Sequence, residues 1–492
     1  MIKNLDPQIV WKNFYELTQI PRPSKHEGKA VEYMYNWGIS HGLETLKDEV
    51  GNIVIRKPAT PGCENMKGVI LQGHIDMVPQ KNADTVHDFE NDPIQTWIDG
   101  DWVKAKGTTL GADNGLGLAM GMAVLESDDL KHGPVELFVT VDEETGMTGA
   151  KALKPGWLKG DILINLDSET EGELYVGCAG GLDTSASAEY EPADYDKSWK
   201  CWSLVVKGFK GGHSGMDIIL CRGNANRLAA RILYALMTEA DVKLLDFEGG
   251  TLRNAIPREA FATVYIPADK VEAAQAVFAR VSAAIKNEYA GTDPDSEFIF
   301  KPYECEEGEC CGGDECKYVP EADALRFIRA IIACPDGVER MSSEMPGLVE
   351  TSNNLAMVKI EGGRFAVKTL MRSSVDTAKE ALASKVEAVF SLAGIDTEFS
   401  GGYSGWAPNP NSAILATMKK VYADLYGKEP AVMAIHAGLE CGILGGIYPD
   451  WDMVSCGPTL MSPHSPDERA NIPSVAKCWD FLKAVLANIP AK

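Results

Sequence analysis

Apolar residues recur along the chain in two alternating patterns, one typical of helices and one typical of buried strands. Helical spacing marks residues from about 5 to 45, where Val10, Phe14 and Leu17 share one face. Short uninterrupted apolar runs, typical of strands buried on both faces, then follow. These runs span residues 52–57, 68–73, 135–144 and 161–169. A helical stretch at 116–127 separates the second run from the third, so the order of elements predicts an α/β sheet with substantial parallel character.

The pattern changes near residue 188, where strands and long helices continue in a different order. Strands are predicted at 198–215, 258–267 and 363–376, and helices at 226–240, 271–289 and 378–394. From about residue 402 the chain returns to a helix at 415–427 and two short strands. Because 492 residues exceed what one hydrophobic core usually spans, we expect two domains, with three as the alternative. The order predicts a discontinuous α/β domain, 1–187 and 402–492, interrupted by an inserted α+β domain, 188–401.

Composition limits what the molecule can bind. Hydrophobic residues make up 45% of the chain and charged residues 24%, which is ordinary for a globular protein and excludes disorder as its overall state. The formal net charge is −24. A field of that sign repels polyanions and anionic membrane surfaces, so neither nucleic acid nor a membrane is an expected partner. Metal cations and small zwitterions remain compatible with it.

Targeting signals and cysteines bear on the compartment. The first 24 residues have neither the apolar core nor the cleavage site of a signal peptide, and no run of 18 apolar residues predicts a transmembrane helix. Most of the 12 cysteines are scattered singly among apolar residues, as are Cys178, Cys334 and Cys441. Dispersed cysteines without a secretion signal predict reduced thiols and a cytoplasmic location.

Candidate chemistry is concentrated where the apolar runs end, and in open α/β sheets that edge binds ligands. His74 and Asp76 follow the run at 68–73, and because they are two residues apart they face the same side of an extended chain. Asp76 could therefore hydrogen-bond the second nitrogen of His74 and raise its basicity as a metal ligand. An isolated His-x-Asp also occurs in ordinary loops.

Further carboxylates lie in comparable places. Asp113 occupies a glycine-rich turn before a helix, where it could cap the helix or bridge two cations. Asp142, Glu143 and Glu144 end the run at 135–144. Three adjacent carboxylates repel one another unless a cation or solvent relieves them. One of them could bind a metal while its neighbour acts as a general base.

Two more residues complete a candidate metal site. Asp167 ends the run at 161–169, where a carboxylate is costly unless it is paired or metal-bound. His464 lies between Pro463 and Pro466, which stiffen its loop, although such a histidine is often only structural. Two histidines and three carboxylates could hold two divalent cations about 3.5–4 Å apart, with zinc favoured and manganese or cobalt also fitting. The sequence contains no GxSxG nucleophile elbow and no Walker-type phosphate loop.

Eight motifs follow one another along the chain: GHIDMV, GADNGLG, DEETGMTGA, NLDSE, GGHSG, TLRNAIPREA, HAGLECG and SPHSPDE. With them the chain resembles the M20 metallopeptidases, and among these the bacterial aminoacyl-histidine dipeptidases, over nearly its whole length. The resemblance implies a zinc-aminopeptidase-like catalytic domain with an inserted α+β lid domain. It also implies two divalent metal ions, a homodimer, and hydrolysis of Xaa-His (carnosine-like) and other unblocked dipeptides.

The resemblance further implies how the metal ligands divide. His74 and Asp167 would bind one cation, and Glu144 and His464 would bind the other. Asp113 would bridge the two.

Three other motif residues would take part in the reaction. Glu143 would be the general base toward the attacking water and then the acid toward the leaving amine. Asp76 would orient His74. His213 of GGHSG would polarise the scissile carbonyl, although a turn histidine beside glycines can also be structural.

The same resemblance implies contacts with the substrate. Asn254 in LRNAIP and Arg372 in LMRSS look like contacts to its carboxylate, and arginine suits a bidentate grip on that group. Gly438 in HAGLE would lie by the substrate backbone. His436 fits core packing as well as it fits a site.

One stretch departs from the resemblance. The sequence CEEGECCGGDEC, residues 305–316, interleaves acids with Cys305, Cys310, Cys311 and Cys316. Its spacing is irregular for a zinc ribbon, so an exposed loop is favoured over a second metal site.

Two rival functions stay open. A carboxypeptidase or an N-acyl amino-acid deacylase of the same clan would use the same cations. A non-catalytic peptide-binding protein would usually lack a metal ligand or the base, whereas all five ligands and Glu143 are present here.

Overall fold

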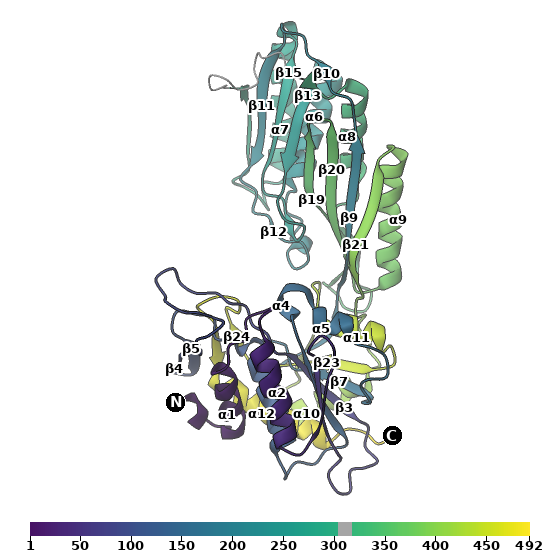
Figure 1. Ribbon diagram of the computed structural model, residues 1–492. Helices are drawn as coiled ribbons and strands as arrows, with labels where there is room; N and C mark the ends of the chain where they lie inside the picture. Colours follow the sequence, from purple (N-terminus) through teal and green to yellow (C-terminus); the bar gives the residue numbers. More distant parts are fainter. Residues whose placement is uncertain (304–316) are drawn as a thin grey trace. The chain divides into compact units, whose positions relative to one another are not determined.

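The computed structural model describes residues 1–303 and 317–492, so the cysteine-rich stretch lies outside the described residues (Figure 1). The chain divides into two compact units. The first unit comprises Met1–Cys178, Trp406–Ala434 and Leu439–Lys492, and the second comprises Ala179–Gly405 and Ile435–Gly438. The chain therefore passes between the units at 178/179 and 405/406, and again at 434/435 and 438/439. The sequence pattern predicted two changes, near residues 188 and 402. No helix among the described residues is long and apolar enough to cross a membrane.

The first unit is built on an eight-stranded sheet with the order β1-β2-β6-β3-β7-β23-β8-β22. Its strands are β1 (Glu44–Lys47), β2 (Ile53–Lys57), β3 (Val69–His74), β6 (Val135–Thr140), β7 (Ile162–Asn165), β8 (Glu173–Cys178), β22 (Ala431–Ile435) and β23 (Asp452–Ser455). Strands β6, β3, β7 and β23 run parallel, which confirms the predicted parallel character. Every residue of β3, β6 and β7 is buried, which explains the uninterrupted apolar runs.

Helices cover this sheet (Figure 1). In one of them every residue except the last, Glu126, is buried. The helices are α1 (Gln8–Thr18), α2 (Gly28–Ser40), α3 (Ala112–Glu126), α4 (Glu143–Gly146), α5 (Thr148–Ala152), α10 (Ala413–Tyr426), α11 (Glu440–Ile447) and α12 (Ile472–Ala487). The buried helix, α3, contacts β3, β6 and α1. A Cβ atom on Gly117 would lie 2.3 Å from the carbonyl oxygen of Leu166, so glycine permits this close approach. The approach brings the start of α3, which carries Asp113, to the sheet.

The first unit also holds a smaller sheet, in the order β24-β25-β5-β4. Its strands are β4 (Thr96–Asp99), β5 (Trp102–Ala105), β24 (Leu460–Met461) and β25 (Arg469–Asn471). The loop between β24 and β25 carries His464, so this sheet anchors both ends of that loop.

The second unit contains a nine-stranded antiparallel sheet, in which β18 pairs with β19 beside the order β16-β11-β15-β13-β19-β20-β9-β21. Its strands are β9 (Gly180–Glu189), β11 (Lys200–Lys207), β13 (Lys243–Gly249), β15 (Ala260–Ile266), β16 (Glu297–Pro302), β18 (Gly337–Met341), β19 (Val349–Glu361), β20 (Arg364–Ser373) and β21 (Asp396–Tyr403). Two short pairs accompany it: β10 (Ala193–Asp194) with β17 (Lys317–Tyr318), and β12 (Gly212–His213) with β14 (Ala255–Ile256). The helices are α6 (Ala225–Ala240), α7 (Val271–Glu288), α8 (Glu321–Ala333) and α9 (Asp376–Leu392).

The second unit contains the same arrangement of strands and helices twice. The first half runs β11-α6-β13-β15-α7-β16, and the second half runs β9-α8-β19-β20-α9-β21. Read from opposite edges of the sheet, the strand orders β16-β11-β15-β13 and β21-β9-β20-β19 match, and the halves join through antiparallel β13 and β19. All four helices contribute to one hydrophobic core. The first half is inserted between β9 and α8 of the second half.

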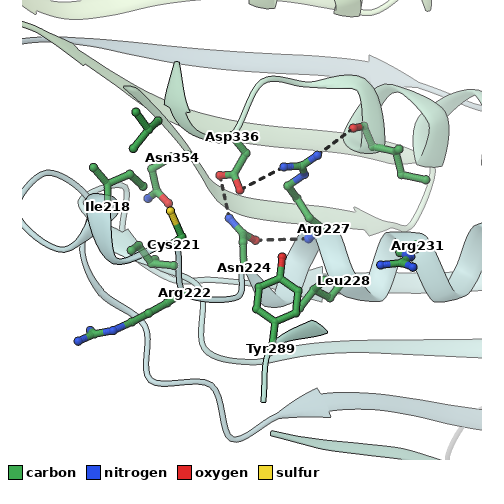
Figure 2. Close-up of a pocket in the computed structure, with 14 residues that line it drawn as sticks. Ile218, Cys221, Arg222, Asn224, Arg227, Leu228, Arg231, Tyr289, Asp336 and Asn354 are labelled. Carbon is green, nitrogen blue, oxygen red and sulfur yellow. Dashed lines mark hydrogen bonds and ion pairs between the residues drawn. The ribbon is translucent and has the colours of Figure 1, made fainter. Parts of the chain in front are cut away.

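A pocket of about 420 Å³ lies where the two halves meet (Figure 2). Its wall contains three arginines, which stand out in an acidic chain, but each has its own acidic partner. Arg227 lies 3.7 Å from Asp336, and Arg231 lies 2.6 Å from Glu288. Arg222 lies 3.9 Å from Asp217 and donates to a backbone carbonyl. Of these three pairs, Arg227 with Asp336 joins the two halves, whereas the other two lie within the first half.

Candidate metal centre

The parallel strands of the first unit bring their carboxyl ends to one edge. His74 is the last residue of β3, and it pairs in register with Thr140 at the end of β6. Asn165 ends β7 and pairs with Gln72 of β3. The acids that follow β6 and β7 therefore start beside His74, as the pattern of strand ends predicted.

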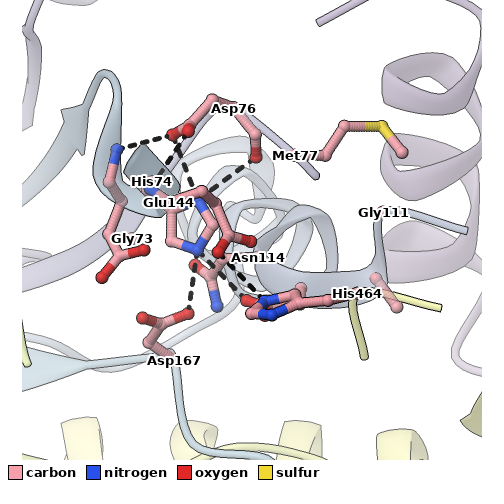
Figure 3. A network of polar contacts seen from close by, with 12 residues as sticks. Gly73, His74, Asp76, Met77, Gly111, Asn114, Glu144, Asp167 and His464 are labelled. Carbon is pink, nitrogen blue, oxygen red and sulfur yellow. Dashed lines mark hydrogen bonds and ion pairs between the residues drawn. The ribbon is translucent and has the colours of Figure 1, made fainter. Parts of the chain in front are cut away.

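Five side chains from different segments form two groups that share one carboxylate (Figure 3). In the first group, His74 Nε2 lies 3.1 Å from Asp113 Oδ1 and 3.4 Å from Asp167 Oδ1. In the second, His464 Nε2 lies 3.2 Å from Asp113 Oδ2 and 3.0 Å from Glu144 Oε2. Within each group the donor atoms lie within 4.8 Å of one another. Asp113 thus offers one oxygen to each group, which is the geometry of a bridging carboxylate.

The chemistry of these side chains suits a cation. The buried Oε1 of Glu144 has no hydrogen-bond partner, and the polar contact of the buried Oδ1 of Asp167 is the one with His74 Nε2 at 3.4 Å. Burial raises the pKa of Asp167 to about 7, and the charges of Asp113 and Glu144 add to this effect. Hydrogen bonds to Asp113 and Glu144 raise the pKa of His464 to about 11. The cluster therefore favours positive charge among its carboxylates, and divalent cations on nitrogen and oxygen donors would supply it.

Asp76 links His74 to the backbone that follows β6. Its Oδ1 lies 3.3 Å from His74 Nδ1 and accepts the N–H of Glu143 at 3.0 Å. Its Oδ2 accepts the N–H of Glu144 at 3.3 Å and the hydroxyl of Ser24 at 2.8 Å. Although burial opposes it, these interactions with His74 and the donors lower the pKa of Asp76 to about 2. Asp76 is placed to fix the orientation of the imidazole and the start of α4.

The three adjacent acids after β6 have different surroundings. Asp142 has a φ of 51°, and its side chain accepts the hydroxyls of Thr145 and Thr148, so it shapes the turn. Glu144 joins the second group of candidate ligands, and it also forms a third group with His74 and Glu143. Burial raises the pKa of Glu143 well above its usual range; His74 opposes the rise and nearby acids add to it.

Glu440 is a buried acid near the site that the motifs did not assign. It starts α11, is 1% exposed, and accepts from Gln72 Nε2 at 2.6 Å and from Thr140 Oγ1 at 2.7 Å. Burial raises its pKa to about 7. The signal in the sequence was an acid within the otherwise apolar stretch around LECGILGG, where a carboxylate needs partners.

The four residues predicted to contact substrate lie in the second unit, and Ser214 and Tyr403 connect them. The N–H of Ser214, the residue after His213, donates to the carbonyl of Asn254 at 2.8 Å. Arg372 donates from Nε to Ser214 Oγ and from Nη1 to the hydroxyl of Tyr403, each at 3.3 Å. A Cβ atom on Gly438 would lie 2.9 Å from that same hydroxyl. Arg372 is 5% exposed, so the guanidinium is held in place rather than free in solvent.

The hydrogen bonds of His213 leave its Nε2 atom as the hydrogen-bond donor of the ring. Its Nδ1 accepts the N–H groups of Gly215 and Met216, at 3.2 and 3.1 Å. Burial and the charge of Arg372 lower its pKa, which favours the neutral ring. A neutral ring that accepts at Nδ1 carries its proton on Nε2.

His436 is a packed residue. It is 6% exposed, and its Nε2 lies 2.7 Å from the hydroxyl of Ser352. Burial, with the charge of Arg372, lowers its pKa to about 3.

Comparison with known proteins gives matches over the whole chain. Peptidase family M20/M25/M40 matches residues 70–488. The cytosol non-specific dipeptidase of Escherichia coli (strain K12) is 45% identical over 491 residues, which cover 100% of this chain and 99% of that protein. The crystal structure of aminoacylhistidine dipeptidase from Vibrio alginolyticus is 47% identical, with a TM-score of 0.94 and coverage of 100% and 99%. The aminopeptidase PepT structure from Bacillus cereus ATCC 10987 shares the fold, with a TM-score of 0.57, 16% identity and 99% coverage of each chain.

These matches confirm the predicted fold class, an α/β catalytic domain with an inserted α+β lid domain. They also confirm the resemblance to M20 metallopeptidases and the prediction of a hydrolase that acts on peptide bonds. Neither the carboxypeptidase nor the deacylase is favoured, because the two relatives that are 45% and 47% identical over the full chain are named as dipeptidases. The chain belongs to peptidase family M20/M25/M40.

Proposed function

We propose that this protein hydrolyses unblocked dipeptides, including those that end in histidine, at a centre for two divalent cations. The observation that carries the proposal is the pair of three-residue groups that share Asp113. The relatives that are 45% and 47% identical over the full chain are named cytosol non-specific dipeptidase and aminoacylhistidine dipeptidase. A substrate range that includes carnosine-like and other dipeptides is consistent with both names.

The five side chains would bind the two cations according to the two groups that their distances define. His74 and Asp167 would hold one, Glu144 and His464 the other, and Asp113 both. Zinc suits this mixture of imidazole and carboxylate donors, and manganese or cobalt also fits it. Two such cations lower the pKa of water and polarise a carbonyl oxygen.

Glu143 would move the proton. Its carboxylate would accept a proton from the attacking water and pass it to the nitrogen of the leaving amine. Asp76 supports this role because it accepts the backbone N–H of Glu143 and also contacts Nδ1 of His74. One carboxylate would thus set the base and a metal ligand relative to each other.

Residues of the second unit would bind the substrate. Arg372, whose guanidinium is fixed by Ser214 and Tyr403, and Asn254 would hold the terminal carboxylate. His213 would donate from Nε2 to the oxygen of the scissile carbonyl. Gly438 would leave room for the substrate backbone. Recognition of a carboxylate one residue beyond the scissile bond would place the cleaved bond next to the last residue, as in a dipeptide.

A cytoplasmic location and a homodimer complete the proposal. The name of the relative from Escherichia coli places that protein in the cytosol, and the scattered cysteines agree with a reducing compartment.

The decisive test uses metal-free protein reconstituted separately with zinc, manganese or cobalt. Each sample is assayed with carnosine, other Xaa-His and generic dipeptides, a tripeptide, and N-acetyl amino acids. We expect cation-dependent turnover of dipeptides with free amino termini and little of the other substrates. Preference for longer peptides or acylated amino acids would instead indicate a carboxypeptidase or a deacylase. Binding of dipeptides without turnover would indicate a peptide-binding protein.

A further inference from the structure

The backbone that leads to Asp113 is held by a single buried carboxylate. Glu468 is 2% exposed. Its Oε2 accepts the N–H groups of Leu110 at 2.7 Å and Gly111 at 3.0 Å. Its Oε1 accepts those of Ala112 at 2.8 Å and Asp113 at 3.3 Å. Four consecutive amides therefore converge on one side chain, and the last of them belongs to the shared carboxylate residue.

A buried cation holds the same turn through its carbonyl. Arg22 is 1% exposed. Its Nη1 donates to the carbonyls of Ile75 and Asp76, at 2.9 and 3.2 Å, and its Nη2 donates to the carbonyl of Gly111. Arg22 thereby ties the backbone just after His74 to the turn that carries Asp113.

Two glycines make room for this guanidinium. A Cβ atom on Gly111 or on Gly115 would lie 2.6 Å from Arg22 Nη2. Gly111, labelled in Figure 3, also has a φ of 69°, which glycine adopts without strain. The turn and the arginine therefore both favour glycine at position 111, and the arginine favours it at position 115.

We propose that Arg22 and Glu468 form a buried clamp that positions Asp113 between the two cation sites. The inference rests on the proposed function, because it assumes that Asp113 bridges two cations. Glu468 follows His464 by four residues, so the clamp also connects the loop of His464 to the turn of Asp113. Both members of the clamp act on backbone groups, and we assign them as positioning residues.

The clamp depends on the chemistry of its two side chains. A glutamine at position 468 would replace one acceptor oxygen with an NH₂ group, so amides that now share that oxygen would lose their partner. A lysine at position 22 would keep the charge but lack the planar fork that reaches three carbonyls at once. An aspartate at position 468 would keep both acceptors on a shorter stem.

The test compares Glu468→Gln, Glu468→Asp and Arg22→Lys with the wild type as full-length proteins. Zinc affinity at each site is measured by competition with a chelator, together with thermal unfolding of the metal-free protein and kcat and KM for a dipeptide. We expect Glu468→Gln and Arg22→Lys to weaken zinc binding about 10- to 100-fold, as loss of groups that orient metal ligands typically does. The value of kcat should fall while KM changes little, and Glu468→Asp should retain more affinity than Glu468→Gln.

Asp293 in the second unit offers a matched control. It is fully buried and accepts the N–H groups of Lys210 and Gly223, each at 2.9 Å. Asp293→Asn should lower thermal stability without changing zinc affinity. Unchanged zinc affinity in folded Glu468→Gln and Arg22→Lys, with only a loss of stability like that of Asp293→Asn, would overturn the clamp. A wild type that binds zinc but hydrolyses no dipeptide would instead contradict the proposed function, and zinc affinity would still decide the clamp.

Discussion

The three adjacent acidic residues at the end of β6 have different hydrogen-bond and ion-pair partners. The side chain of Asp142 is occupied by two threonine hydroxyls, whereas Glu144 lies 3.0 Å from His464. Glu143 lies between them in sequence, and Asp76 holds its backbone amide. Asp142 has a left-handed backbone, and the two glutamates that follow it form a group with His74.

The first prediction concerns the proposed base. Glu143→Gln keeps the size and the backbone contacts of the side chain but cannot take up a proton. We expect kcat to fall by about 10²- to 10⁴-fold, the usual contribution of a general base, while bound metal stays the same. Turnover of the purified variant and its metal content, measured by elemental analysis, test this together. Retention of most of the turnover in a metal-loaded sample would remove Glu143 from the role.

The second prediction concerns recognition of the substrate carboxylate. Arg372→Lys should raise KM about 10-fold or more for dipeptides, because a charge-assisted hydrogen bond is worth about 1.5–3 kcal/mol. The matched control is a dipeptide amide, which lacks the carboxylate. Wild type and variant should differ much less on the amide, and an equal effect on both substrates would show that Arg372 contacts another group.

The third prediction is a pH dependence of stability due to His436. Its pKa is lowered to about 3 by burial, whereas an unfolded chain has an ordinary histidine near 6.5. Above pH 6.5 neither state is protonated and the residue has no effect on the pH dependence. As the pH falls from 6.5 toward 3 the unfolded state takes up a proton that the folded state refuses, so stability is lost by about 1.4 kcal/mol per pH unit.

His436→Asn should remove this loss. Free energies of unfolding by denaturant, measured for both proteins at several pH values from 7.5 to 5, should diverge below about pH 6.5. Parallel pH profiles would show that the imidazole of His436 is accessible to protons in the folded state.

At the scale of elements, the apolar runs predicted β2, β3, β6 and β7 because these strands are buried on both faces. Strand β19 carries the polar sequence TSNN at 351–354, and those residues are buried through pairing with β18 and β20. A polar stretch gives no such periodic signal, because its burial depends on partners far away in the chain.

The same reasoning separates the residues whose roles the motifs indicated from those without an assigned role, such as Glu468, the last residue of SPHSPDE. His74, Asp113 and Glu144 are visible because their side chains stand at strand and helix ends. Arg22 and Glu468 bind backbone groups of distant segments, and any sequence there offers the same amides and carbonyls. Only the folded chain shows which backbone groups they reach.

The fourth prediction concerns the seam between the halves of the second unit. Gly250 follows β13, has a φ of 74°, and a Cβ atom there would lie 1.8 Å from the carbonyl oxygen of Ala356 in β19. Gly250→Ala should destabilise the second unit by about 1–3 kcal/mol through overlap and backbone strain. Gly362→Ala is the matched control, since its φ is 58° and it has open space around it. Equal losses in denaturant unfolding would show that the seam relaxes around the added methyl group.

At the scale of the whole molecule, a bound cation is expected to stabilise the first unit and not the second. All five candidate ligands belong to the first unit, and the second unit has its own hydrophobic core. A ligand stabilises only the part of the chain that binds it, by about 2.7 kcal/mol at a free concentration 100 times its Kd.

The fifth prediction concerns the unfolding temperatures of the two units, measured by calorimetry. Removal of metal should lower the unfolding temperature of the first unit and leave that of the second unchanged. The transitions can be assigned with Gly250→Ala, which should shift only the second. His464→Ala should abolish most of the shift caused by metal, and a shift of both transitions would show that the units unfold together.

Strand β23 has a consequence for how the protein is made. It lies between β7 and β8 in the central sheet, yet it follows them by more than the length of the whole second unit. During synthesis at about 5–20 residues per second, the ribosome needs roughly 15–60 s to reach it after β8 has emerged. Over that interval β7 and β8 have no partner between them, while every strand of the inserted unit becomes available. We expect the inserted unit to fold on the ribosome first, and the amino-terminal segment to depend on chaperones until the last part of the chain arrives.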